Sequence, residues 1–253
     1  MSELKFEICA NSVQSCIEAQ KGGADRVELC AGIPEGGTTP SYGEILIARK
    51  HLSIKLHVII RPRGGDFLYS PTELEIMEND IINAKKLGAD GVVIGCLNSS
   101  GNINIEFCKK LISVTKGMSI TFHRAFDCCQ NQLMALEQII DMGCERILTS
   151  GGYSTAEEGI MQLKILNKAA HGRIKIMAGC GVNQNNIAKI HKNADIKEFH
   201  FSARETFRSK MQFQNPKIYM GLPGIKENEI TETTSSKVKK IVKAISESNF
   251  LGI

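Results

Sequence analysis

Short apolar runs alternate along this chain with longer stretches in which apolar residues recur at the spacing of an amphipathic helix. The short runs predict strands over residues 6–10, 26–30, 56–62, 91–96, 119–124, 146–150, 175–179 and 198–203. The longer stretches predict helices over residues 12–21, 41–51, 71–87, 104–116, 130–142, 156–170, 184–192 and 235–248. Eight strands that alternate with helices through short connections favour a parallel sheet of the α/β class, which can close into a TIM (β/α)8 barrel.

Sequence signals at the ends of these elements support the alternation. Ser41 and Glu44 form a capping-box pattern at the start of a predicted helix, and Pro71 suits a first helical turn. A small residue followed by an acid and then a predicted strand recurs about every 50 to 65 residues, which matches the length of two β/α units. The copies of this pattern are residues 23–28, 88–93, 143–148 and 194–199.

Residues 204–234 interrupt the pattern after the last predicted strand. The segment is long, contains Pro216 and Pro223, and carries charged residues around Asn228, so it predicts no further barrel unit. We interpret it as a loop that forms a lid or contacts another subunit of a homo-oligomer. Residues 1–253 are therefore expected to form a single TIM-barrel domain whose last helix covers residues 235–248.

Strand periodicity divides the barrel side chains into two sets, because successive side chains on a strand point to opposite faces. The set expected to face the helices is apolar and comprises Ile8, Val27, Leu29, Val58, Ile60, Phe122, Ile147, Phe199 and Phe201. The set expected inside the barrel near its C-terminal end is polar and comprises Glu7, Cys9, Glu28, Cys30, His57, Arg61, Thr121, His123, Ser150, His200 and Ser202. An interior that serves stability alone is filled mainly by branched aliphatic residues, so this polarity is the strongest functional signal in the chain.

Two short segments on the first two predicted strands share one pattern. Glu7 and Cys9 are two residues apart, as are Glu28 and Cys30, so each acid and its thiol point to the same side of a strand. A buried carboxylate costs several kcal/mol unless it is paired, so packing does not explain this arrangement. Cys9 and Cys30 can hold a soft metal ion such as Cu(I), and the alternative is two buried, inert thiols.

The polar interior also offers groups for proton transfer, although no residue is established as catalytic. Glu7 or Glu28 is a candidate general base, and His123 or His200 can pass protons at neutral pH. Acids and histidines at the C-terminal mouth match the placement of active sites in barrel enzymes. The alternative is a closed salt-bridge network that satisfies itself and has no catalytic role.

Two kinds of loop at the predicted mouth are candidates for binding an anion. Arg61 and Arg63 flank Pro62 ahead of a glycine turn and Asp66, which suits the capture of a carboxylate or phosphate by guanidinium groups. Other loops carry small residues that resemble phosphate-binding turns, with charged neighbours at the rim. These residues are Arg124, Asp127, Ser150, Gly151, Gly152, Gly179, Gly181 and Ser202. The alternatives are solvated charges in a turn and glycines that only redirect the chain.

Composition narrows the function classes. The 253 residues are 42% hydrophobic and 23% charged, the net charge is +4, and no basic run is interleaved with aromatics, so no nucleic-acid partner is expected. No apolar segment is long enough to span a membrane and the first residues do not resemble a signal peptide, so we expect a cytoplasmic protein with no membrane partner. The nine cysteines lack zinc-type spacing, and most are expected to be reduced. Four occupy predicted apolar positions, namely Cys16, Cys96, Cys108 and Cys144.

Six motifs follow one another along the chain: EIC at residues 7–9, GGADRVELC at 22–30, EGGTTPS at 35–41, RPRGGDF at 61–67, TFHRAFD at 121–127 and ILTSGG at 147–152. Together they resemble the copper homeostasis protein CutC family over nearly the whole chain through Ala203. The resemblance implies a cytosolic TIM barrel that takes part in copper homeostasis, with Cu(I) bound through the cysteines that match Cys9 and Cys30. It implies no established catalytic activity. Cys180, between Gly179 and Gly181, departs slightly from the glycine-rich pattern of the family.

Two hypotheses of different classes follow. The first is a cytosolic protein that binds or handles copper, with Cu(I) held by the cysteine pair at the barrel mouth. The second is a TIM-barrel enzyme of unassigned reaction that acts on a small anionic or phosphorylated metabolite. The thiol pair favours copper, whereas the surrounding acids, arginines and histidines favour catalysis, and the resemblance places copper homeostasis first.

Overall fold

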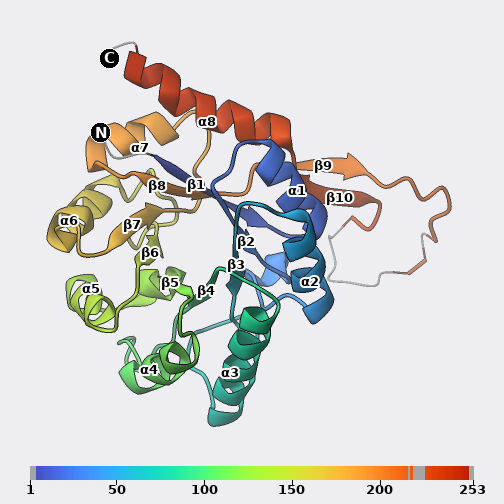
Figure 1. Ribbon diagram of the computed structural model, residues 1–253. Helices are drawn as coiled ribbons and strands as arrows, with labels where there is room; N and C mark the ends of the chain where they lie inside the picture. The colour runs from blue at the N-terminus through green and yellow to red at the C-terminus, as the bar shows by residue number, and fades with distance from the viewer. Residues whose placement is uncertain (1–3, 216, 219–225, 251–253) are drawn as a thin grey trace.

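Eight parallel strands close into a barrel in the computed structural model, which describes residues 4–215, 217–218 and 226–250 (Figure 1). Each strand pairs with the next along the chain, and the eighth pairs with the first to complete the ring. The strands are β1 Lys5–Ala10, β2 Arg26–Leu29, β3 Lys55–Ile59, β4 Gly91–Ile94, β5 Ser119–Phe122, β6 Arg146–Thr149, β7 Lys175–Ala178 and β8 Glu198–Phe201. The TIM barrel predicted from the alternation of elements is therefore confirmed.

Helices follow the strands and surround the barrel (Figure 1). They are α1 Val13–Lys21, α2 Tyr42–His51, α3 Pro71–Lys86, α4 Ile105–Val114, α5 Gln132–Asp141, α6 Ile160–Ala170, α7 Ile187–Ala194 and α8 Ser235–Phe250, with short 3-10 helices η1 Ile33–Glu35 and η2 Arg124–Cys128 in two loops. The predicted capping box of Ser41 and Glu44 is present, and a second box of Ser70 and Glu73 begins α3. Among the described residues, no helix combines the length and apolar character that a membrane span requires.

The main hydrophobic core lies between the outer face of the barrel and the helices. Every apolar side chain predicted to face the helices is buried there, namely Ile8, Val27, Leu29, Val58, Ile60, Phe122, Ile147, Phe199 and Phe201. The four cysteines predicted at apolar positions are buried in the same core. A smaller apolar cluster of Cys30, Ile59 and Val93 is separate from that core. Strand periodicity therefore predicted correctly which side chains pack against the helices.

Several predicted strands extend beyond their observed C-terminal ends. The third was predicted over residues 56–62, whereas β3 ends at Ile59, and the eighth was predicted over residues 198–203, whereas β8 ends at Phe201. Beyond these points the chain leaves the sheet to form the loops of the mouth. Two helices also begin later than predicted, because turns precede α6 and α7.

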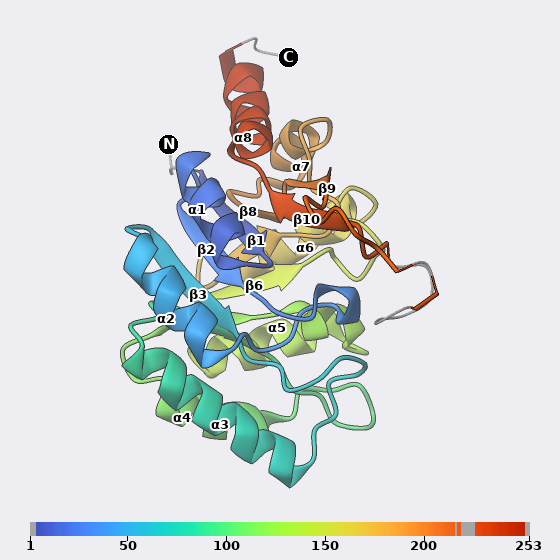
Figure 2. The same cartoon turned by 90° about the vertical axis from the view of Figure 1, so that its right-hand side faces the viewer.

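The prediction of a loop over residues 204–234 is wrong at both ends of this segment, where strands form. Arg204–Arg208 form β9 and Glu229–Thr233 form β10, and these strands pair as an antiparallel ribbon at the side of the barrel (Figure 2). Asn11 Nδ2 donates to Thr231 O at 2.7 Å, which ties β10 to the end of the loop after β1. The strands were missed because their mostly exposed side chains form no apolar run. Residues 216 and 219–225 lie outside the described residues, and the role of this segment as a lid or subunit contact stays a prediction.

Candidate metal centre at the barrel mouth

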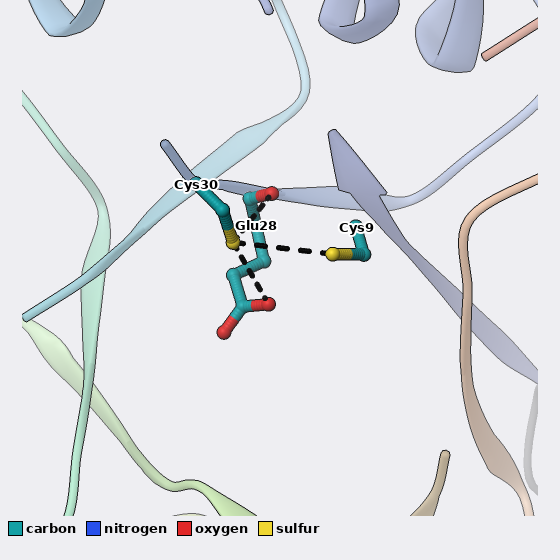
Figure 3. A group of neighbouring side chains, drawn as sticks. All are labelled: Cys9, Glu28 and Cys30. Carbon is teal, nitrogen blue, oxygen red and sulfur yellow. Dashed lines mark hydrogen bonds between the residues drawn. The ribbon is translucent and has the colours of Figure 1, made fainter. Parts of the chain in front are cut away.

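Strands β1 and β2 bring the two pairs of acid and thiol together at the barrel mouth. Cys9 lies opposite Glu28 in the register of these strands, and Cys30 directly follows β2. The sulfur atoms of Cys9 and Cys30 are 3.9 Å apart, and Cys30 Sγ is 3.3 Å from Glu28 Oε2 (Figure 3). One ligand atom from each of these three residues lies within 4.8 Å of the others. We call Cys9, Glu28 and Cys30 the thiol cluster.

A histidine connects the thiol cluster to a second acid. Glu7 and His200 occupy paired positions on β1 and β8. His200 Nδ1 lies 2.7 Å from Glu7 Oε1, and His200 Nε2 lies 3.6 Å from Glu28 Oε2. The imidazole is also close enough to the Cys9 thiol to lower its pKa. His200 therefore lies beside both acids and influences the less buried of the two sulfurs.

A network of ion pairs fills the barrel toward the N-terminal ends of the strands. Arg26 binds the carboxylate of Glu7, and its Nη2 lies 3.0 Å from Glu198 Oε2. Arg146 Nε lies 3.2 Å from the same oxygen of Glu198. An ion-pair network is thus present next to the thiol cluster, but Glu28 Oε1 is buried without a partner, so the alternative of a closed network that satisfies itself stays a prediction. The sequence prediction missed Arg26, Arg146 and Glu198, although each shares the strand parity of the predicted interior residues.

The two sulfurs differ in ionisation. The hydrogen bond from Cys30 holds the pKa of Cys9 well below its usual range despite burial, and His200 and Arg204 act in the same direction. The same contact, together with burial, raises the pKa of Cys30 well above its usual range. The contact between the two sulfurs therefore favours ionisation of Cys9 over ionisation of Cys30.

The acids and the imidazole around the sulfurs are also shifted. Burial raises the pKa of Glu28 to about 8. Burial alone would raise the pKa of Glu7, but Arg26 and His200 hold it well below its usual range. Burial alone would lower the pKa of His200, yet its contacts with Cys9 and Glu7 raise it well above its usual range. At neutral pH the site therefore contains an ionised Glu7, a charged His200 and a mostly protonated Glu28.

Arg204, the first residue of β9, reaches the thiol cluster from the ribbon. Its Nη2 lies 3.3 Å from both Cys9 Sγ and Cys9 O. Its Nε is buried and has no hydrogen-bond partner. The sequence prediction missed this residue because it placed Arg204 in a loop beyond the barrel. Its position directly after the eighth strand was the only signal that it belongs to the mouth.

His57 and His123 are neutral side chains inside the barrel. His57 Nδ1 is 3.8 Å from Glu7 Oε2, which is too long for a hydrogen bond. His123 Nδ1 accepts the backbone N–H of Ala125 at 3.2 Å, and its ring packs against Phe67 with centroids 5.0 Å apart. Burial lowers the pKa of each histidine to about 3. Neither ring carries charge at neutral pH, and His123 Nε2 is buried without a partner.

The arginines predicted to bind an anion hold loops of the mouth together. Arg61 donates to backbone oxygens of three loop residues at 2.7 to 2.9 Å. Arg63 donates to the carboxylates of Glu73 and Asp66. Partners within the protein thus take up most of their N–H donors, and anion binding by Arg61, Arg63 and Asp66 stays a prediction.

The loop after β6 binds a carboxylate of the protein itself. Asp127 accepts hydrogen bonds from the backbone N–H groups of Ser150 and Gly152, with Gly152 N at 3.0 Å, and from the Thr149 hydroxyl. Arg124 Nε lies 2.7 Å from the same carboxylate. The protein's own acid thus occupies the N–H groups that the sequence suggested for a bound phosphate.

The other predicted loop residues have evident structural roles. A Cβ added at Gly179 would lie 2.4 Å from Leu148 Cδ1, so close packing requires glycine there. The carbonyl oxygen of Ser202 accepts a hydrogen bond from β10 at 2.8 Å. Three glycines have the positive φ that other residues rarely adopt, namely Gly151, Gly152 and Gly181. These roles do not depend on a ligand.

Comparison with known proteins finds relatives over almost the whole chain. A sequence model of the CutC family matches residues 4–205. A CutC family protein of Bacteroides fragilis is 58% identical over 250 residues, which cover 98% of this chain and 100% of that protein. The human copper homeostasis protein cutC homolog is 44% identical over 237 residues, which cover 93% of this chain and 87% of that protein.

Solved structures agree with the observed barrel. The crystal structure of a CutC protein from Streptococcus agalactiae superposes with a TM-score of 0.76 at 37% identity, over 79% of this chain and 98% of that one. Thiamine phosphate pyrophosphorylase from Pyrococcus furiosus superposes with a TM-score of 0.58 at 15% identity, over 96% of each chain. The second likeness shows a shared fold alone.

Proposed function

The chain belongs to the CutC family, and on that premise we propose that it serves copper homeostasis in the cytoplasm by binding Cu(I) through Cys9 and Cys30. The observation that carries this proposal is the 3.9 Å separation of the two sulfurs. Metal–thiolate bonds of about 2.3 Å allow two sulfurs on one ion to lie at most about 4.6 Å apart. The two sulfurs are therefore close enough to bind one ion together. In this proposal copper is the ion that the protein carries.

The ligand atoms favour Cu(I) over other common ions. Thiolates select soft ions, and two of them satisfy Cu(I), whereas a structural Zn²⁺ requires four ligands. The third member of the thiol cluster, Glu28, has a pKa of about 8 and lies within hydrogen-bond distance of Cys30. A protonated carboxyl is a poor ligand for Mg²⁺ or Ca²⁺, which prefer ionised oxygens. Arg204 next to Cys9 offsets the negative charge of a bound thiolate.

A competition titration tests the proposal. The reduced protein is titrated with Cu(I) against a chelator, and the wild-type chain is expected to take up one ion. The Cys9→Ser, Cys30→Ser double variant should lose this uptake. Cys180→Ser is the matched control, because Cys180 is also partly exposed at a loop of the mouth. Equal affinity in the double variant and the wild type would remove the thiol cluster as the copper site.

A second candidate function is an enzyme that acts on a small anionic or phosphorylated metabolite. The buried Nε2 of His123, which has no partner within the protein, supports a polar ligand in the mouth. The Nη groups of Arg61, which bind backbone oxygens, and the internal carboxylate of Asp127 give an anion less room. Soaking crystals with phosphate tests this candidate, and an empty mouth at saturating phosphate would count against it.

A further inference from the structure

A cavity of about 320 Å³ lies between α2 and α3, two neighbouring helices of the barrel wall (Figures 1 and 2). Tyr42 and Ile45 line it from α2. Ile76, Asp80 and Asn83 line it from α3. Spacings of three or four residues place the lining side chains of each helix on one face. The volume is far larger than that of a single water molecule and suits a small organic molecule.

The cavity is separate from the thiol cluster. Thr38 and Thr39 line the cavity, whereas the preceding Gly37 lies against Cys30, because a Cβ added at Gly37 would be 3.7 Å from Cys30 Sγ. Arg61 also lines the cavity, but its Nη atoms donate to backbone oxygens of the mouth loops at 2.7 to 2.9 Å. The cavity therefore shares no residue with the candidate metal centre, and its one guanidinium group is bound elsewhere.

Asp80 gives the cavity an acid without a basic partner. The side chain is half-buried, and burial raises its pKa. A neighbouring cation would lower that pKa, but only the Thr39 hydroxyl acts in this direction. Asp90 is also partly buried, and Arg49 Nη1 and Lys55 Nζ each lie 2.7 Å from its carboxylate. Within the part of the chain that the structure describes, Asp80 lacks the counter-ions that the fold provides for Asp90.

Apolar surface surrounds this acid. Tyr42 and Ile76 are 61% and 46% exposed, and Ile45 and Pro62 extend the apolar wall of the cavity. The Tyr42 ring can hold an organic cation against its face. The Asn83 side chain supplies an amide oxygen that can accept a hydrogen bond. A single carboxylate among apolar walls is a poor site for Ca²⁺ or Mg²⁺, which bind through several oxygens.

We propose that this cavity binds a small primary amine as an alkylammonium ion. The ammonium group pairs with Asp80, and the hydrocarbon chain packs on Tyr42 and Ile76. An ammonium group has three donors, so Asp80 and Asn83, three positions apart on α3, can accept from it together. The site goes beyond copper binding and does not depend on it, because none of its residues belongs to the thiol cluster.

Titration of the reduced protein with n-butylamine tests the proposal, with backbone amide NMR shifts as the readout. Butylamine carries an ammonium group at neutral pH on a short apolar chain. We expect saturable shifts for residues 38–45 and 76–83, with a Kd on the order of 1 mM for a ligand of this size. Butanol lacks the charge and ammonium chloride lacks the chain, so each should bind at least about 10-fold more weakly.

Variants assign the site to its residues. Asp80→Asn keeps the shape of the side chain and removes its charge, so it should weaken butylamine binding about 10-fold. Tyr42→Leu removes the aromatic ring and should weaken binding about 3-fold. Glu75→Gln is the matched control, because Glu75 is an exposed acid of α3 that does not line the cavity. Its affinity for butylamine should equal that of the wild type.

A variant with a gain of affinity keeps the test decisive if Asp80→Asn does not fold. Asn83→Asp adds a second carboxylate at an exposed position of the cavity and should strengthen butylamine binding about 3-fold. An affinity of Asn83→Asp no higher than that of the wild type would count against the proposal.

Three further outcomes would overturn the proposal. They are no shifts at residues 38–45 and 76–83, equal binding by Asp80→Asn and Glu75→Gln, and butanol binding as tight as that of butylamine. Measuring Cu(I) uptake on the same preparations separates the two functions. The Cys9→Ser, Cys30→Ser double variant should retain butylamine binding, and Asp80→Asn should retain Cu(I) uptake. A wild-type protein that binds Cu(I) but no butylamine keeps the copper function and loses this one, and the reverse result does the opposite.

Discussion

Charged side chains on two sides of the barrel mouth differ in how completely they are hydrogen-bonded. On the side of β5 and β6, Asp127 is bound by backbone N–H groups, a hydroxyl and Arg124. On the side of β1, β2 and β8, Glu28 Oε1 and Arg204 Nε are buried without partners next to the two sulfurs. Buried polar atoms are normally satisfied because their desolvation costs free energy. The charged residues at the loop after β6 thus stabilise the fold, while the charged residues next to the two sulfurs retain an unused donor and an unused acceptor.

The largest effect is expected from neutralising Asp127, whose carboxylate is hydrogen-bonded within the protein. Asp127→Asn should lower the free energy of unfolding by about 3 kcal/mol, because an amide cannot accept all of the hydrogen bonds and leaves Arg124 without its ion pair. Urea denaturation measures the change, and the Cu(I) affinity should stay the same. Asp66→Asn is the control, because that carboxylate is exposed and its pair with Arg63 is screened by solvent, so its loss of stability should be much smaller. Equal losses in both variants would remove the distinction between the two sides.

A smaller effect is expected from pH on the side of the thiol cluster. The pKa of Glu28 is raised to about 8 in the folded protein, so the folded state holds its proton more tightly than the unfolded state. This contribution to stability is full below the unfolded pKa of about 4 and is lost as the pH rises through about 8. Relative to Glu28→Gln, the wild-type free energy of unfolding should therefore fall by about 2 kcal/mol between about pH 6 and pH 8.

Urea denaturation at several pH values measures this difference. Cys30 and His200 contact Glu28 and also titrate, and both remain in the Glu28→Gln variant, so subtraction leaves mainly the part that depends on the carboxyl. Parallel pH profiles in the two proteins would show that Glu28 is ionised in the folded state.

The smallest effect is expected from removing one arginine side chain on each side of the mouth. Arg204→Met should weaken Cu(I) binding about 10-fold, or about 1.4 kcal/mol, because a cation next to the Cys9 sulfur stabilises a bound thiolate. Arg124→Met is the matched control, because Arg124 pairs with a carboxylate and a hydroxyl on the opposite side. Chelator competition measures both affinities. The same loss in both variants would indicate a general effect of charge, without a specific role for Arg204.

The fold and the placement of the thiol cluster could be predicted because both depend on local spacing. Alternation of apolar and polar residues fixes which face of a strand each side chain occupies, and residues two apart share a face. Glu7 and Cys9, and likewise Glu28 and Cys30, therefore point the same way, and parallel pairing of adjacent strands brings the two pairs together. The alternation of strands and helices leaves few ways to complete the barrel.

The contacts that distinguish the two sides of the mouth depend on residues far apart in the chain. Arg61 donates to backbone oxygens of other loop residues, and Asp127 accepts N–H groups from the loop after the next strand. No spacing in the sequence shows that these partners meet. Arg204 was missed for the same reason, because its contact with Cys9 joins residues 195 positions apart.

Arg204 connects a helix on the outside of the barrel to the Cys9 sulfur. The backbone oxygen of Arg204 accepts a hydrogen bond from Lys237 of α8, and its side chain rests on Cys9. One residue at the root of the β9–β10 ribbon (Figure 2) thus joins α8 to the less buried of the two sulfurs. A change in the packing of α8 or of the ribbon is therefore expected to reach the cation beside Cys9 without passing through the strands of the barrel.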